Sequence, residues 1–390
     1  MKSKVSKLVQ QLKPSGIRAF FDLVLGMKDV VSLGVGEPDF VTPWQIREAG
    51  IYSLEQGFTS YTSNKGLYKL RLSLSRFIKQ HYGVEYCPDE EILITVGVSE
   101  AIDLGLRAVL EPQDKVLIPI PAFVSYGPVT ELAGGIPVYI DTKKDGFKLT
   151  PKNLSRHIDK KVKAIILNYP NNPTGVSYTR KELEALKKII VSHGIICFSD
   201  EVYGDLTYDF KHTCFSSLAH AKPLTVYLNG FSKSFAMTGW RVGYACGPKD
   251  IIAAMTKIHQ YTIMCVSITS QMAAAEALAV GYPSVEEMKK EYNRRRQFVC
   301  AGLNRMGIKV QLPQGAFYVF ADISLTGMKS LDFAQLLLKE EKVAVVPGTA
   351  FGENFNDYIR ISYASGFEQI KEALIRMERF LARNKRRRKG

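Results

Sequence analysis

One lysine lies in an apolar stretch, where a charged side chain is costly to bury. Lys233 stands between two serines in NGFSKSFAMTGWRVGY, and lysine is seldom buried without a chemical task. An apolar pocket lowers the pKa of an amine, and the neutral amine is the form that makes a Schiff base with a carbonyl carbon. Arg241, predicted on a strand in the same stretch, could hold a phosphate with two hydrogen bonds. The segment predicts amine chemistry on a phosphorylated ligand.

A carboxylate ends a second apolar run, IICFSD. Asp200 needs a cationic or N–H partner there, because burying an unpaired carboxylate is very costly. A protonated pyridine nitrogen would supply that partner, and the ion pair would keep the ring electron-withdrawing. Tyr203, three residues later, could place its phenol on the same ligand. The alternative is a capping aspartate beside a core tyrosine.

Two polar turns also follow apolar runs. In GVSEA, the backbone N–H groups of Ser99, Glu100 and Ala101 and the serine hydroxyl would face an anion at the start of a helix. Ser99 could instead serve only as a helix cap. In NYPNNPTG, flanking prolines restrict Asn172, which could donate to a ring oxygen or be only a turn residue.

The elements that must position these side chains alternate along the chain. β-rich runs are expected at 91–97, 114–121, 135–141, 163–170, 194–204, 224–230 and 240–248, and helices at 99–110, 124–133 and 179–194. This alternation favours an α/β fold with a mostly parallel sheet and helices on both faces. Ligands of such sheets bind outside the carboxyl ends of the strands, which is where the four segments fall.

The last hundred residues predict a smaller α+β unit. A charged helix at 285–307 precedes the strands IKVQLP and GAFYVFADI, a helix in LDFAQLLLKEE, the strands VAVVPG and YIRISYA, and a final helix at 367–382. We expect a large domain over 45–284. The N-terminal arm, 1–44, and residues 285–390 would form the arm and small domain.

Composition excludes several classes of protein. The chain has 390 residues, 46% hydrophobic and 23% charged, without an apolar run long enough to span a membrane. Its first residues lack the pattern of a signal peptide, which predicts a cytoplasmic protein. The six cysteines are scattered without a CxxC pair, so no metal site is expected.

The net charge of +14 invites a nucleic-acid interpretation, but a basic tail, RNKRRRK, carries much of the excess. Such a run is usually a solvated end, and no DNA- or RNA-binding signature accompanies it. We therefore expect neither a nucleic-acid nor a membrane partner, with a weak nucleic-acid tether as the alternative. The charge also suits an enzyme of anionic substrates.

The motifs together resemble those of the class I/II aminotransferases, which are fold type I enzymes that use pyridoxal 5′-phosphate. They are GEPD at 36–39, Tyr61 before SNKG, NNPTG, DEVY, SKSFAMTGWRVGY and YIRISYA, in the family's order and spacing from about Pro14 to the final helix. GMKDVVSLGVGEPDF and PIPAFVSYGPV are most similar to archaeal-type aromatic aminotransferases, and the bacterial A-type enzymes are nearly as similar.

The resemblance implies a role for each matching residue. Lys233 would be the Schiff-base lysine and carry a proton between Cα and C4′, and Asp200 would pair with the pyridinium nitrogen. Asn172 and Tyr203 would hold the phenolic oxygen. Phe123 would stack on the ring. The phosphate would be bound by Ser99 with its neighbouring amides, Ser232, Arg241 and Tyr61 of a second subunit. Arg360 would bind the substrate carboxylate, with Gly36 and Asn172 also contacting the substrate. A homodimer with shared active sites is implied.

Two departures from the family pattern bear on the substrate. Gly230 stands where a well-known aspartate aminotransferase subgroup has a phosphate-binding serine, and no match is found for that subgroup's distal arginine. Arg18 could bind the second carboxylate of a dicarboxylate substrate, as that distal arginine does, or it could be a surface arginine. We expect an aromatic amino donor and 2-oxoglutarate as acceptor. Aspartate aminotransferase and, less favoured, a C–S β-lyase are the alternatives.

Overall fold

Seven of the strands in the first 250 residues form one sheet. The computed structural model describes residues 4–14, 16 and 27–387. The strands are β2 (Ile92–Thr95), β3 (Lys115–Ile120), β4 (Ile136–Asp141), β5 (Val162–Asn168), β6 (Ile196–Asp200), β7 (Thr225–Gly230) and β8 (Gly243–Cys246). Their order is β2-β8-β7-β6-β5-β3-β4, and only β8 runs antiparallel to its neighbours. The predicted α/β fold with a mostly parallel sheet is confirmed.

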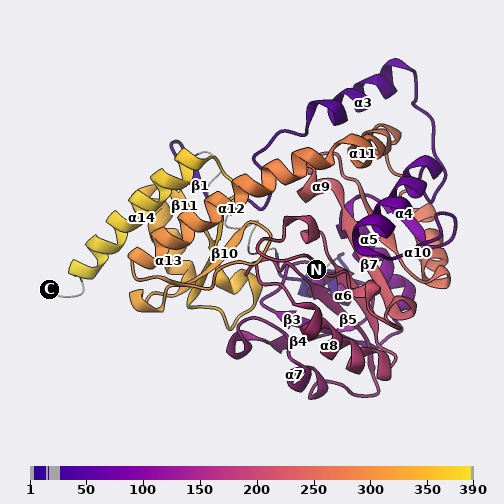
Figure 1. Ribbon diagram of the computed structural model, residues 1–390. Coiled ribbons are helices and arrows are strands. Elements are labelled where there is room, and N and C mark those ends of the chain that lie inside the picture. The colour runs from indigo at the N-terminus through magenta and orange to yellow at the C-terminus, as the bar shows by residue number, and fades with distance from the viewer. Residues whose placement is uncertain (1–3, 15, 17–26, 388–390) are drawn as a thin grey trace.

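Helices cover both faces of this sheet, which is why its central strands are apolar on both sides. Ile166 and Phe198 pack with α5 (Gly97–Val109), α6 (Tyr126–Leu132) and α10 (Lys249–Thr262). Ile165 and Cys197, one residue earlier in each strand, pack on the opposite face with α7 (Pro151–Ser155) and α8 (Arg180–Ser192). The central strands are thus buried between two helical layers (Figure 1).

Residue chemistry explains where α8 begins. The Thr179 hydroxyl accepts from the Glu182 backbone N–H, and the Glu182 carboxylate accepts from the Thr179 backbone N–H. This capping box satisfies N–H groups that the helix cannot bond internally. The helix ends at Ser192, just before the left-handed Gly194.

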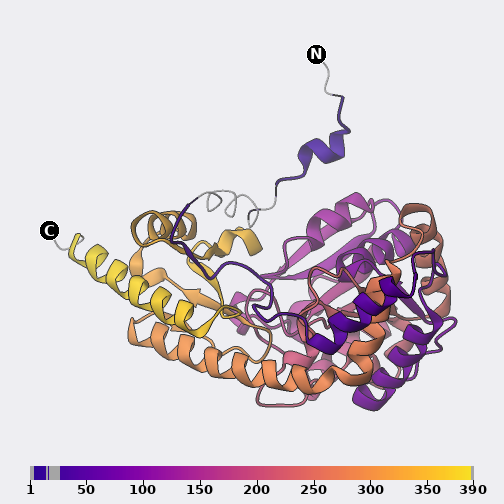
Figure 2. The same ribbon diagram turned by 90° about the horizontal axis from the view of Figure 1, so that it is seen from above.

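A second sheet forms in the last part of the chain. Its four strands, ordered β12-β13-β10-β9, are β9 (Lys309–Val310), β10 (Tyr318–Asp322), β12 (Val346–Pro347) and β13 (Tyr358–Ser362). They pack with α12 (Tyr282–Arg305), α13 (Ser330–Glu341) and α14 (Phe367–Arg387). Figures 1 and 2 show α12 running from the seven-stranded sheet past the smaller one.

The prediction of one strand in VAVVPG is wrong. β11 (Val343–Ala344) pairs in parallel with β1 (Val31–Ser32), whereas β12 joins the four-stranded sheet. The two halves of the segment thus belong to different sheets. This pairing ties the N-terminal arm to the later part of the chain.

The remaining helices are α1 (Lys7–Gln11), α3 (Trp44–Glu55), α4 (Tyr68–Tyr82), α9 (Phe231–Ser234) and α11 (Ile268–Val280). α3 and α4 both pack against α11. None of the helices among the described residues is long and apolar enough to cross a membrane.

Candidate active site

A cavity of about 520 Å³ lies at the carboxyl edge of the seven-stranded sheet. Residues from both sheets and from the N-terminal arm line it. The predicted site residues in its lining are Gly36, Ser99, Phe123, Asn172, Asp200, Tyr203, Ser232, Lys233, Arg241 and Arg360. Glu100, Ala101 and Tyr61 are not in the lining, and Arg18 lies outside the described residues.

Strand ends bring the polar residues together. Asn168 and Asp200 are the last residues of β5 and β6 and face each other in the sheet register. Gly230 ends β7, and the short helix α9 that follows carries Lys233. Because these parallel strands end at one edge, residues more than sixty positions apart meet at one cavity.

The expectation that Arg241 lies on a strand is wrong. It occupies a turn before β8, with a left-handed φ of 50°, and is exposed towards the cavity. β8 runs antiparallel to β2 and β7, so its first residue lies at the carboxyl edge of those strands. The reversal of one strand therefore delivers Arg241 to the same edge as Lys233.

Asp200 is a buried carboxyl group with two hydrogen-bond donors. The Tyr126 hydroxyl donates to its Oδ2 at 2.6 Å, and the Val202 backbone N–H donates to its Oδ1 at 3.3 Å. Burial raises the pKa of Asp200 to about 6, although both hydrogen bonds and the Lys233 charge oppose the rise. A cationic partner within the cavity would stabilise its ionised form.

The amine of Lys233 is held within the cavity wall. Its Nζ donates to the Gly36 carbonyl oxygen at 2.8 Å. Desolvation lowers the pKa of Lys233 to about 8; nearby Glu37 opposes this shift, whereas Arg241 and Arg360 reinforce it. The neutral amine needed for attack on a carbonyl is therefore accessible near neutral pH.

The start of α5 forms a cradle for an anion. No side chain caps this helix, and a Cβ added to Gly97 would lie 2.7 Å from Nη2 of Arg241. Ser99 and Ser232 line the cavity at the same place. Free N–H groups at a helix start, two hydroxyls and a guanidinium are the donors that bind phosphate.

The Glu100 side chain faces away from this cradle. It accepts from the Val96 backbone N–H and bonds to Nδ1 of buried His259 at 2.7 Å. Any contribution of Glu100 to an anion in the cradle is thus limited to its backbone. Ala101 is buried within α5.

Arg360 lies on the other side of the cavity, on β13. Its guanidinium is buried and donates to Asn172 Oδ1 at 2.9 Å and to the Gly34 carbonyl oxygen at 2.5 Å. The Tyr318 ring lies 4.6 Å from its central carbon. Its Nε is buried without a hydrogen-bond partner among the described residues. A carboxylate in the cavity would satisfy that unpaired cationic group.

Two tyrosines complete the polar wall. The hydroxyls of Tyr203 and Tyr318 lie 2.8 Å apart, and the Tyr318 hydroxyl also donates to the Gly36 carbonyl oxygen at 3.4 Å. Burial raises the pKa of Tyr203 well above its usual value, so its phenol is neutral and can donate. Phe123 lies edge-on to Tyr126, with ring centroids 5.7 Å apart.

Sequence reasoning missed two of these groups. Tyr126 lies three residues after Phe123 in PAFVSY and begins α6, and nothing in that spacing points to Asp200. Tyr318 lies in the predicted strand GAFYVFADI, but which face it takes depends on the smaller sheet. Neither partner of Asp200 and Tyr203 was therefore among the predicted site residues.

The residues fit a phosphorylated cofactor with a cationic ring nitrogen. The cradle of Gly97 and Arg241 suits the phosphate, and Asp200 suits the ring nitrogen. Lys233 lies between them with an amine of lowered pKa. Among the described residues, no group of three or more His, Cys, Asp or Glu side chains could hold a metal ion.

Comparisons with known proteins agree with this chemistry. The family model described as aminotransferase class I and II matches residues 28–376. A putative aminotransferase, YugH, of Bacillus subtilis is 50% identical, covering 98% of this chain and 99% of the relative. An aspartate aminotransferase of Pyrococcus abyssi is 45% identical, covering 98% of this chain and 99% of that protein.

A solved structure extends the likeness to three dimensions. The aromatic aminotransferase from Pyrococcus horikoshii OT3 superposes with a TM-score of 0.90 and 44% identity, covering 95% of this chain and 99% of that chain. The likeness thus includes relatives named for aspartate and for aromatic substrates.

Proposed function

The chain belongs to the class I and II aminotransferases, and on that premise we propose which residues carry its reaction and which substrates it takes. It is a pyridoxal-phosphate-dependent enzyme that exchanges an amino group between an amino acid and a 2-oxo acid. When bound, pyridoxal phosphate supplies an electron-withdrawing ring that stabilises the negative charge left at the substrate Cα.

Asp200 and the anion cradle would hold the two ends of the cofactor. Asp200 would bind the ring nitrogen, and Arg241, Ser99, Ser232 and the first amides of α5 would bind the phosphate. Asn172 and Tyr203 would donate to the ring oxygen, with Phe123 against the ring face. The single observation that carries this assignment is that the Asp200 carboxyl, the Lys233 amine and the Arg241 guanidinium line one cavity.

Lys233 would attach the cofactor covalently, and its amine would move a proton after the amino group of the substrate has displaced it from the cofactor. Its lowered pKa supports a neutral Nζ that can accept the proton from the substrate Cα. Desolvation helps because the uncharged amine is the form favoured in an apolar site. The Gly36 carbonyl oxygen, 2.8 Å away, would hold the amine in place before it reacts.

Arg360 would bind the α-carboxylate of the substrate. Its buried Nε, which has no hydrogen-bond partner in the part of the chain that the structure describes, and its fixed contacts to Asn172 and Gly34 support a preorganised carboxylate site. Because the guanidinium geometry is set before substrate arrives, little rotamer freedom is lost on binding.

We propose aromatic amino acids as favoured donors and 2-oxoglutarate as acceptor. The cavity lining includes the apolar or aromatic side chains of Val35, Ile102 and Tyr318. Arginine and lysine in the described lining are accounted for by Lys233, Arg241 and Arg360, which already have roles. The aromatic aminotransferase of Pyrococcus horikoshii, at 44% identity, also supports this choice.

Aspartate is the second candidate donor, because the Pyrococcus abyssi relative at 45% identity is named an aspartate aminotransferase. Absorbance titration of the cofactor-loaded protein with phenylalanine and with aspartate separates the two. We expect phenylalanine to change the cofactor spectrum and 2-oxoglutarate to restore it. A kcat/KM for aspartate about tenfold or more above that for phenylalanine would reverse the assignment. Release of ammonia and pyruvate from cystathionine without a keto acid would instead indicate β-lyase activity.

We also propose a homodimer in which Tyr61 reaches the phosphate of the partner's site. Tyr61 is 82% exposed and does not line the cavity of its own subunit. Asn64 bonds to the Met264 carbonyl oxygen at 2.8 Å, which joins this segment to the exposed Tyr261 and Ile263. Trp44, Ile51, Tyr52, Leu54 and Phe58 are also exposed apolar or aromatic side chains, and we propose that all of these residues share one apolar face. Such faces usually mark interfaces.

The domain division also remains a proposal. The strands of the seven-stranded sheet fall within 45–284, and the four-stranded sheet falls within 285–390, which supports the division, and the expected boundary lies inside α12. The cytoplasmic location stays a prediction.

A further inference from the structure

Two carboxylates adjacent in sequence point to opposite faces of the seven-stranded sheet. Asp200 ends β6 and lines the cavity, whereas Glu201 follows it and is 0% exposed. Successive side chains of an extended strand alternate between faces, so Glu201 lies on the face of Cys197 and Ser199. It is thus a second buried acid directly behind the site.

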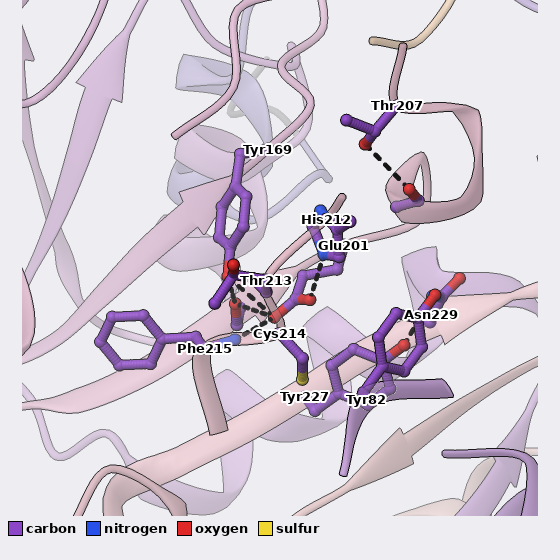
Figure 3. Close-up of polar contacts among 12 residues, drawn as sticks. Tyr82, Tyr169, Glu201, Thr207, His212, Thr213, Cys214, Phe215, Tyr227 and Asn229 are labelled. Atoms are coloured by element: carbon purple, nitrogen blue, oxygen red, sulfur yellow. Dashed lines mark hydrogen bonds and ion pairs between the residues drawn. The ribbon is translucent and has the colours of Figure 1, made fainter. Parts of the chain in front are cut away.

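Glu201 is held by four hydrogen-bond partners. Its Oε1 accepts from the Ser199 hydroxyl at 2.7 Å, the Tyr169 hydroxyl at 3.1 Å and the Phe215 backbone N–H at 3.0 Å. Its Oε2 bonds to Nε2 of His212 at 2.6 Å. Figure 3 shows the contacts of Tyr169, His212 and Phe215 with the carboxylate. Donors on every side make a buried carboxylate tolerable.

His212 is fixed by its surroundings. Its ring stacks on Tyr169, with centroids 5.2 Å apart, and meets the edge of Tyr82 at 5.9 Å. A Cβ added to Gly204 would lie 3.1 Å from the ring. Its Nδ1 is buried without a hydrogen-bond partner in the described part of the chain. A proton on Nε2 alone satisfies Glu201 without burying a second, unpaired N–H.

Glu201 also joins the turns that carry the cofactor-binding residues. Its carbonyl oxygen accepts from the Gly204 N–H at 2.7 Å, which closes the turn containing Tyr203. Tyr169 donates its hydroxyl to Glu201 and its backbone N–H to the Asp200 carbonyl oxygen at 3.2 Å.

The second turn is tied to the same point. Asn168 donates its side-chain amide to the Asp200 carbonyl oxygen at 3.1 Å, and its Oδ1 accepts from the Asn172 N–H at 2.9 Å. Because Tyr169 follows Asn168 directly, a shift of the Glu201 carboxylate moves both turns. The side chains of Asp200, Tyr203 and Asn172 would move with them.

We propose that Glu201 and His212 are positioning residues that hold Asp200, Tyr203 and Asn172 in the geometry that binds the cofactor ring. This inference rests on the proposed function, because it takes the ring-binding roles of those three residues as given. Neither side chain lines the cavity, so both act through the turns above them.

Substitutions at the pair test the proposal. Glu201→Gln places an amide N–H among donors, and His212→Phe keeps a ring but removes the Nε2 donor. We expect each to weaken pyridoxal-phosphate binding about tenfold or more and to shift the pH dependence of the bound cofactor's visible absorbance. His212→Gln returns an N–H donor near the Nε2 position and should recover most of the affinity.

Two neighbouring tyrosines provide a matched pair of variants. The rings of Tyr169 and Tyr178 pack edge to face at 5.6 Å, and both are buried. The Tyr178 hydroxyl accepts from the Leu149 N–H, on the side away from Glu201. We expect Tyr169→Phe to weaken cofactor binding and alter the absorbance, whereas Tyr178→Phe should lower only the melting temperature.

Asp200→Asn serves as the reference for the ring-nitrogen contact. If it weakens cofactor binding but Glu201→Gln and His212→Phe leave the dissociation constant within about twofold of wild type, the positioning role is wrong. The same holds if the pair variants alter only the melting temperature, as Tyr178→Phe does. If Asp200→Asn itself leaves cofactor binding unchanged, the assigned role of Asp200 fails instead.

Discussion

The Tyr126 hydroxyl donates to one carboxylate oxygen of Asp200 at 2.6 Å, and both groups are buried. Tyr126 is the first residue of α6, and Asp200 is the last residue of β6. Burial raises the pKa of Asp200 to about 6, and this hydrogen bond is the largest influence that opposes the rise. The Tyr126 hydroxyl, at the start of α6, thus favours the ionised form of Asp200.

Replacing Tyr126 with phenylalanine should raise the pKa of Asp200 further, because the ionised form loses a donor. A protonated Asp200 cannot pair with a cationic ring nitrogen. We expect the variant to bind pyridoxal phosphate about tenfold more weakly than wild type at pH 6, with a smaller ratio at pH 8. Fluorescence titration of the apoprotein measures both ratios. Equal ratios at the two pH values would contradict the assignment.

The raised pKa of Asp200 also makes the stability of the cofactor-free protein depend on pH. Between its ordinary value of 3.8 and about 6, the folded state keeps a proton that the unfolded state has lost. The free energy of unfolding therefore falls as pH rises through this window, by about 3 kcal/mol from this group. Asp200→Asn should remove this pH-dependent fall in the free energy of unfolding.

Urea unfolding of the apoprotein at two pH values checks this sign. We expect Asp200→Asn to be more stable than wild type at pH 7, by up to about 3 kcal/mol, and to differ little at pH 4. A variant less stable than wild type at pH 7 would show that hydrogen bonds to the carboxylate outweigh its desolvation.

Gly97 provides a test of the anion cradle. Alanine there would meet Arg241 at 2.7 Å, on a backbone with φ of 73°. Gly83 has a φ of 72° but open space around the added Cβ, so Gly83→Ala carries the same backbone strain of about 1 kcal/mol without the contact. We expect both variants to melt at lower temperature, but only Gly97→Ala to lose about tenfold or more in cofactor affinity. Equal cofactor affinities in the two variants would show that Gly97 is not part of the anion cradle.

Arg360→Lys should separate substrate binding from cofactor binding. Lysine retains the charge but cannot reproduce the planar donor set that reaches Asn172, Gly34 and a carboxylate. We expect kcat/KM for phenylalanine to fall about 10- to 150-fold, with the pyridoxal-phosphate dissociation constant within about threefold of wild type. A comparable loss of cofactor affinity would place Arg360 on the cofactor instead.

The proposed dimer face can be disrupted by one charge. Leu54 lies on that face and is 57% exposed, whereas Ile375 is 49% exposed on α14. Leu54→Asp should lower the sedimentation coefficient towards that of a monomer and reduce activity, because Tyr61 would lose its partner. Ile375→Asp should leave the assembly unchanged. A wild-type protein that sediments as a monomer would refute the proposed assembly.

Local patterns predicted much of the fold. Apolar runs located the strands of the larger sheet, and the polar residues at their ends were expected at one edge for reasons of strand direction alone. The Arg241 strand was wrong because nothing in the local apolar pattern indicates the left-handed φ of Arg241, so the strand begins only at Gly243. VAVVPG reads as one strand, but its halves have different partners.

Contacts between distant elements account for the rest. Nothing near Asp200 in the sequence indicates that Tyr126 will donate to it, and nothing near Glu201 indicates His212. These pairs form only when loops and helices are packed on the sheet. The resemblance to a family supplied roles for the residues in the matching motifs. It did not supply roles for Tyr126, Glu201 and His212, which contact those residues or their neighbours.

The antiparallel placement of β8 has a consequence for the order of folding. Thr95 pairs with Gly243, and these residues are about 150 positions apart along the chain. Closing so long a loop is slow, and the contacts it creates form late compared with local helices. The cradle between Gly97 and Arg241 cannot exist before this closure. Capture of phosphate by a refolding chain would therefore mark a late step in folding, and a nascent chain that ends before β8 would lack the cradle.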